Sequence, residues 1–100
     1  MKLKIAQGFK YQGDDWWKWW VWIEGTDADL NRIKNVTYIL HKSFPQPVRT
    51  VKDRSTNFRL EASGWGTFRI YANVLDDDGG TYKLSHDLVL EYPDGSETTA

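Results

Sequence analysis

Two short segments of the chain place aromatic side chains beside residues that donate or accept hydrogen bonds. Residues 41–47 read His-Lys-Ser-Phe-Pro-Gln-Pro, and residues 64–68 read Gly-Trp-Gly-Thr-Phe. An imidazole and a hydroxyl can hold the polar atoms of a ligand, while phenyl and indole rings can stack on a flat group. Their combination predicts a binding cleft built from two loops.

The backbone chemistry of both segments favours open loops. Pro45 and Pro47 fix their own φ and push the residues before them, Phe44 and Gln46, toward extended conformations. The glycines on either side of Trp65 allow its large indole to lie at a loop tip. A purely structural interpretation remains open, in which Phe44 and Trp65 anchor their loops to the core.

The same residue types do not form a convincing catalytic site. His41, Ser43 and Asp87 are the types found in hydrolase triads, but there is no nucleophile elbow and no glycine-rich oxyanion turn. The two histidines, His41 and His86, lack a clear third metal ligand. Residues 76–78 are three aspartates, but the downstream carboxylate of a calcium loop is missing at the required spacing. We therefore expect a protein that is not an enzyme and that uses no metal and no cofactor.

Composition narrows the class of protein further. The chain has 100 residues, six tryptophans, no cysteine and a net charge of −1. That length fits one domain, and the mixed charges give no basic stripe, so we expect no direct binding to nucleic acid. No segment in this sequence is apolar enough for a signal peptide or a membrane span. We expect a cytoplasmic protein, or a nuclear one if the source is eukaryotic.

The elements that must position the two loops are predicted strands. Short apolar or alternating runs separated by turn residues lie at 1–11, 16–24, 36–41, 48–52, 57–61, 68–74 and 81–92. Residues 29–34 fit one helical turn, and Gly8 is expected to form a bulge or a bend in the first strand. This spacing predicts an all-β, immunoglobulin-like antiparallel β-sandwich of about seven to eight strands. The sandwich is expected to span residues 1–93, with residues 94–100 as a frayed polar tail.

The second predicted strand carries most of the tryptophans. One of its faces is purely apolar and is expected to face the core: Trp17, Trp19, Val21 and Ile23. The other face mixes rings with charges, which allows an exposed aromatic platform of Trp16, Trp20 and Trp22. A platform of this kind suits stacking on sugar rings, so a carbohydrate-binding domain is an alternative function.

Several motifs of this sequence resemble those of YEATS domains. Residues 40–47, Leu-His-Lys-Ser-Phe-Pro-Gln-Pro, match the signature Leu-His-x-Ser-Phe-x-x-Pro, and residues 64–68 are similar to the second aromatic loop of that family. Residues 19–25 and 84–90 are similar to two of its strands. The short length and the density of tryptophan resemble the prokaryotic branch.

The resemblance implies an immunoglobulin-like sandwich that reads acylated lysine, because nuclear members bind acetylated or crotonylated lysine of histone tails. It implies that the backbone amide of Trp65 receives the acyl carbonyl. The residues implied to bind the acyl-lysine are His41, Ser43, Phe44, Gly64, Trp65, Gly66, Phe68 and Asp87. The pattern departs from the nuclear readers at Asp15, where they have an aromatic residue that Trp16 or Trp17 would have to replace.

The expected partner is an acylated protein or peptide. A further alternative is an adaptor or sensor domain that recruits another protein through a face of the sandwich and is fused to an effector domain.

Overall fold

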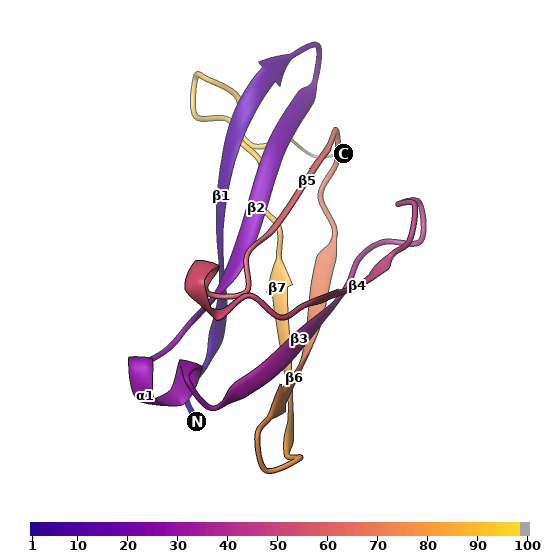
Figure 1. The fold of residues 1–100 in the computed structure, drawn as a ribbon. Helices are drawn as coiled ribbons and strands as arrows, with labels where there is room; N and C mark the ends of the chain where they lie inside the picture. The colour runs from indigo at the N-terminus through magenta and orange to yellow at the C-terminus, as the bar shows by residue number, and fades with distance from the viewer. Residues whose placement is uncertain (99–100) are drawn as a thin grey trace.

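The computed structural model describes residues 1–98 and consists of two antiparallel sheets packed face to face (Figure 1). The first sheet has the strand order β1-β2-β5 and the second β4-β3-β6-β7. In chain order the elements are β1 (Lys4–Gly13), β2 (Trp16–Glu24), α1 (Asp27–Leu30), β3 (Ile33–Ile39), β4 (Val48–Val51), the 3₁₀ turn η1 (Arg54–Thr56), β5 (Leu60–Gly64), β6 (Arg69–Asp76) and β7 (Thr81–Asp87). The predicted immunoglobulin-like β-sandwich is confirmed.

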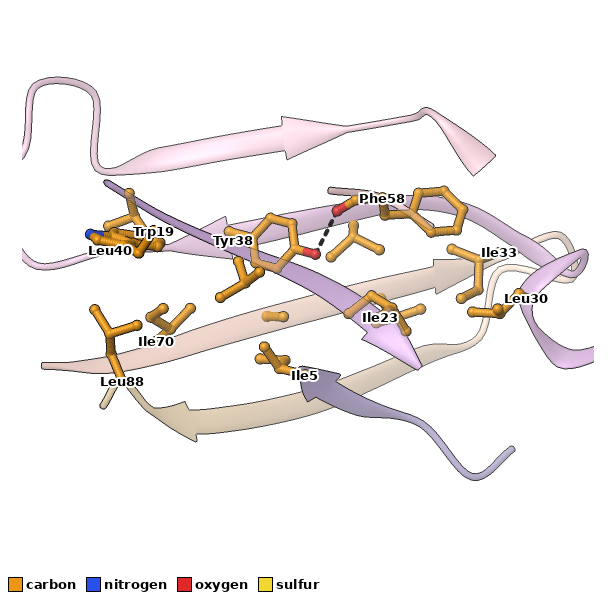
Figure 2. Packing of buried hydrophobic residues seen from close by; sticks show 14 of the residues in the cluster. Ile5, Trp19, Ile23, Leu30, Ile33, Tyr38, Leu40, Phe58, Ile70 and Leu88 are labelled. Atoms are coloured by element: carbon orange, nitrogen blue, oxygen red, sulfur yellow. Dashed lines mark hydrogen bonds between the residues drawn. The ribbon is translucent and has the colours of Figure 1, made fainter. Parts of the chain in front are cut away.

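The core lies between the two sheets and follows the alternation expected of strands with one buried face. The four residues predicted to form the inner face of β2 are all completely buried. Val36 and Tyr38 of β3 and Ile70, Ala72 and Val74 of β6 join them in one buried cluster from the second sheet. Figure 2 labels Tyr38 and Ile70 among these residues.

One buried hydrogen bond ties β3 to the segment that precedes β5. The hydroxyl of Tyr38 donates to the carbonyl of Phe58 at 2.6 Å, which Figure 2 marks with a dashed line. Both residues are fully buried, and burial raises the pKa of the Tyr38 phenol well above its ordinary value. The hydroxyl therefore remains a donor at any physiological pH.

Several local predictions were wrong, and each has a physical reason. The helical turn α1 begins at Asp27, earlier than predicted, because Thr26 caps it by accepting from the backbone N–H of Asp29 at 3.1 Å. Strand β5 begins only at Leu60, because Asn57 and Phe58 have φ of 56° and 60° and turn the chain.

Another concerns Gly8, which keeps its place in the register opposite Trp20, so the bulge predicted there as one possibility is absent from the described β1–β2 pairing. The irregularity in the pairing of β1 with β2 lies instead between Tyr11 and Gly13. Gly8 is a glycine for another reason: a Cβ built there would lie within 2.7 Å of three atoms of the Trp20 indole. The ring therefore lies directly on the backbone of β1.

Strand β7 also ends earlier than predicted, at Asp87 rather than at residue 92. Beyond it the backbone leaves β6: the N–H of Val89 donates to the side chain of Gln7 on β1 at 2.9 Å. The side chain of Gln7 in turn donates to the carbonyl of Val89 at 2.7 Å and lies 2.6 Å from the ring of His86. These contacts join the two sheets along one side of the sandwich.

The last described residues turn back along the chain rather than fraying. The N–H of Tyr92 donates to Ser96 at 2.7 Å and that of Thr98 to Leu90 at 3.0 Å. Of the predicted polar tail, residues 99 and 100 lie outside the described part of the chain.

Candidate binding cleft

The loop at residues 40–47 joins β3 to β4 and is closed by its own backbone. Leu40 donates to the carbonyl of Pro47 at 2.8 Å, and Phe44 donates to the carbonyl of His41 at 3.0 Å. Gln46 has a φ of 49°, so the prediction that it is extended was wrong. The turn at this position directs two carbonyls toward Arg49, whose guanidinium donates to Gln46 at 3.1 Å and Pro45 at 3.0 Å.

His41 and Ser43 are joined within this loop by two hydrogen bonds. The backbone N–H of Ser43 donates to Nδ1 of His41 at 3.2 Å, which makes Nδ1 an acceptor. The Oγ of Ser43 lies 2.8 Å from the same nitrogen, so its hydroxyl also donates there. The lone pairs of the Ser43 oxygen are thereby left to accept a hydrogen bond from elsewhere.

The floor of the site is a cluster of rings. Phe44 lies 5.2 Å from Phe68, and the two meet the indole of Trp19 at 6.0 and 5.8 Å with steep interplanar angles of 82° and 67°. The imidazole of His41 lies 6.2 Å from Phe68. Edge-to-face contacts of this kind are favourable, so the floor is continuous with the hydrophobic core.

The second loop supplies the opposite wall. It runs from Gly64 at the end of β5 to Arg69 at the start of β6, and the carbonyl of Phe68 accepts from Leu88 at 3.1 Å. Trp65, at the loop tip, leaves 62% of its surface exposed, unlike the fully buried Trp17 and Trp19. Its indole is therefore not an anchor of the loop to the core.

The two loops enclose a cleft of about 390 Å³. Its lining residues are Trp16, His41, Ser43, Phe44, Pro45, Ser63, Gly64, Trp65, Gly66, Thr67 and Phe68. This set includes all but one of the residues that the sequence analysis singled out for acyl-lysine binding. Ser63 and Thr67 were not singled out, although each is adjacent in sequence to a residue that was.

Asp87 is the exception and lies elsewhere. It stands opposite Arg69 in the β6–β7 register, and its two carboxylate oxygens accept from the guanidinium at 2.7 and 3.3 Å. The hydrogen bond from Arg69 lowers the pKa of the Asp87 carboxyl. Asp87 is thus held in an exposed ion pair and is not among the residues that line the cleft.

The three tryptophans of the suggested platform lie in three different environments. Trp16 is 43% exposed and lines the cleft, so it, rather than the fully buried Trp17, is the aromatic residue beside Asp15 that reaches the site. Trp20 lies on Gly8 and is covered by the guanidinium of Arg59, 5.0 Å from the ring. Trp22 lines a separate groove together with Leu3 and Thr26. Each of the three rings therefore belongs to a different part of the surface: the cleft, the cover of β1 and a separate groove.

Within residues 1–98, no group of three or more histidine, aspartate or glutamate side chains is arranged to hold a metal ion. No helix in this part of the chain has the length and apolar character that crossing a membrane requires.

Comparison with known proteins places these features in a family. Over residues 17–89 the chain matches the model of the prokaryotic YEATS domain. It is 33% identical over 66 residues to transcription initiation factor TFIID subunit 14 of Schizosaccharomyces pombe. The aligned region covers 65% of this chain and 27% of the relative. It is 34% identical over 68 residues to the protein AF-9 homolog of Eremothecium gossypii, covering 66% of this chain and 32% of the relative.

Solved structures agree on the fold. The Yaf9 YEATS domain bound to H3K27ac superimposes with a TM-score of 0.73 at 22% identity, covering 97% of this chain and 79% of the other. The Yaf9 YEATS domain recognizing an H3K122suc peptide gives a TM-score of 0.63 at 22% identity, covering 96% and 72%. The match to the two curated relatives spans about a quarter to a third of their length. Since the family model covers more than half of the sequence, the chain belongs to the prokaryotic YEATS domain family.

Proposed function

We propose that this chain is a non-catalytic recognition module whose cleft takes the acylated side chain of a lysine on a protein partner. The observation that carries the proposal is the exposed indole of Trp65 at the lip of a cleft whose floor is formed by Phe44 and Phe68. Aromatic walls around an open slot favour a flat, uncharged group.

The charge of the lysine explains why acylation would be required. An unmodified ammonium group is costly to bury without a partner, and no aspartate or glutamate of the described residues lines the cleft. Acylation removes the charge and leaves a planar amide. That amide can stack on the rings at little cost in desolvation.

The amide also has polar atoms, and the cleft offers a partner for each. In our proposal the amide N–H donates to the oxygen of Ser43, whose own proton is committed to His41. The acyl carbonyl accepts from the backbone N–H of Trp65. Because the group is small, we expect weak binding, with a dissociation constant in the micromolar range at best.

Solved structures of a protein with the same fold support this proposal. The Yaf9 YEATS domain, which shares the fold, has been solved with the acylated histone peptides H3K27ac and H3K122suc. The histone and the position are properties of that protein. For this chain we propose only an acylated-lysine peptide or protein, and an effector domain fused to it remains a further proposal.

The geometry favours recognition over hydrolysis. The hydroxyl of Ser43 and the imidazole of His41 are paired, as a nucleophile and base would be. A third group that orients the base is needed for such a pair to work, and Asp87 is instead bound to Arg69 through both oxygens.

Amide NMR titration with acetyl-lysine, crotonyl-lysine and unmodified lysine peptides tests the proposal. We expect the acylated peptides to shift resonances of residues 41–44 and 64–68, while the unmodified peptide leaves them in place. Ser43→Ala should weaken binding. Tyr71→Ala is a matched control, because Tyr71 is 48% exposed but does not line the cleft. Shifts confined to other parts of the molecule would reject the acyl-lysine assignment.

A further inference from the structure

The indole N–H of Trp19 is a buried donor without a partner. Among the described residues no acceptor lies within hydrogen-bonding reach of Nε1, although the side chain is completely buried. Trp17, two residues earlier on the same face of β2, donates its own indole N–H to the carbonyl of Glu91 at 2.8 Å. Buried donors are nearly always paired, so the orphaned N–H of Trp19 calls for an explanation.

This N–H lies immediately behind the wall of the cleft. A Cβ built at Gly64 would be 4.0 Å from Nε1 of Trp19 and 3.7 Å from Cζ of Phe44. Gly64, Phe44 and Phe68 all line the cleft, and the two phenyl rings contact the indole. Figure 2 shows the nitrogen at one end of the buried cluster. Because residue 64 is a glycine, it places no side chain of its own in front of this N–H.

We propose that the Trp19 N–H is a specificity-determining donor for a neutral oxygen carried on the acyl chain, so that the module prefers hydroxyacyl-lysine to the plain acyl group of the same length. The inference rests on the function proposed above and names the class of acyl group. A hydroxyl oxygen reaching past Gly64 would pair with the N–H, whereas a hydrocarbon tip would leave it unpaired.

The charges around the cleft favour a hydroxyl over a carboxylate. Within residues 1–98, no lysine or arginine lines the cleft. The nearby guanidinium of Arg49 lies 5.9 Å from the Phe44 ring and is committed to the carbonyls of Pro45 and Gln46. A carboxylate among these rings would lose its hydration and gain only one donor, which is unfavourable.

The test compares two peptides that differ by a single hydroxyl group. Dissociation constants are measured by calorimetry or NMR for butyryl-lysine and 3-hydroxybutyryl-lysine peptides of the same sequence. We expect the hydroxylated peptide to bind wild type about fivefold more tightly. With Trp19→Phe, which removes the N–H, the ratio of the two constants should fall to about one. A Trp17→Phe variant, whose lost N–H already has a partner, should retain the preference.

Two further measurements keep the test decisive if Trp19→Phe folds poorly. The indole N–H resonance of Trp19 in the wild-type protein should move downfield with the hydroxylated peptide and not with the butyryl peptide. Gly64→Ala should also abolish the preference, because its methyl group fits at ordinary contact distances and fills the space in front of the N–H.

The outcomes separate this inference from the proposed function. Equal binding of both peptides to wild type, with no change at the Trp19 N–H, would overturn the inference and leave acyl-lysine recognition intact. Such a result would mean that the N–H points at the faces of the phenyl rings. If no acylated peptide binds at all, both proposals fail.

Discussion

The ring of Phe44 lies 5.2 Å from that of Phe68, although the two residues belong to loops that connect different pairs of strands. Each ring also meets the edge or face of Trp19 in the core. The floor of the cleft is therefore an extension of the hydrophobic core, while its lip, Trp65, is largely exposed. Floor and lip should respond differently to substitution.

Trp65→Ala should abolish binding of acylated peptides and leave the fold intact. The indole is 62% exposed, so its loss removes little buried surface, and we expect the free energy of unfolding to change by no more than about 0.5 kcal/mol. Urea denaturation measures the stability and NMR titration the binding. A large loss of stability would show that the indole anchors the loop instead.

Phe68→Ala should lower both the stability of the fold and the affinity for acylated peptides. The ring packs on Phe44, Trp19 and His41, and its backbone carbonyl holds Leu88. We expect unfolding to become easier by about 2–4 kcal/mol, somewhat below the cost for a fully buried phenylalanine. Phe68→Leu, which keeps most of the volume, should recover much of the stability but not the aromatic stacking with a ligand. Urea denaturation and peptide titration of the two variants check this.

The sequence predicted the parts of the fold that depend on the alternation of apolar and polar side chains along a strand. The inner face of β2 was predicted correctly, because period-2 burial is visible in single residues such as Val21 and Ile23. The predicted cleft residues had two signals, aromatic side chains and adjacent prolines or glycines. Ser63 and Thr67 also adjoin a glycine, but their small hydroxyl side chains are common in ordinary turns.

What could not be predicted depends on contacts between segments distant in sequence. Nothing near Gly8 shows that the indole of Trp20 will cover it, since that contact needs the β1–β2 register. The left-handed turn at Asn57 and Phe58 contains no glycine, so the usual sign of positive φ was missing. Asp87 pairs with Arg69 only because the β6–β7 hairpin places them opposite each other.

Asp76→Asn should destabilise the β6–β7 hairpin. The carboxylate is 3% exposed and accepts from the backbone N–H groups of Asp78 and Gly80 at 2.9 and 2.7 Å and from the hydroxyl of Tyr82 at 3.2 Å. An amide that presents its NH₂ to these donors loses some of the bonds. We expect the melting temperature to fall by several degrees, as measured by calorimetry at neutral pH. Asp77→Asn, an exposed neighbour in the same turn, should have little effect.

The same carboxylate gives the stability a pH dependence. Burial raises the pKa of Asp76, but the hydrogen bonds from Gly80, Asp78 and Tyr82 and the charge of Arg32 outweigh this and lower it below its ordinary value. A group with a lowered pKa in the folded state stabilises the protein above its unfolded pKa and loses that contribution as the pH falls through the folded value. Stability should therefore decline in acid more steeply for wild type than for Asp76→Asn. Parallel declines in the two proteins would contradict this assignment.

Gly8→Ala should displace the indole of Trp20 from the surface of β1. A methyl group at this position would lie within 2.7 Å of three indole atoms, so either the ring or the strand has to move. We expect a loss of about 1–3 kcal/mol, the usual cost of overpacking, together with a red shift in tryptophan fluorescence as the ring becomes wetter. Gln12→Ala is the control, because Gln12 is an exposed residue of the same strand.

Since Trp20 lies outside the cleft, the Gly8 variant should still bind acylated peptides at temperatures where it is folded. An unchanged fluorescence maximum and an unchanged midpoint of unfolding would mean that the indole does not rest on the backbone in solution.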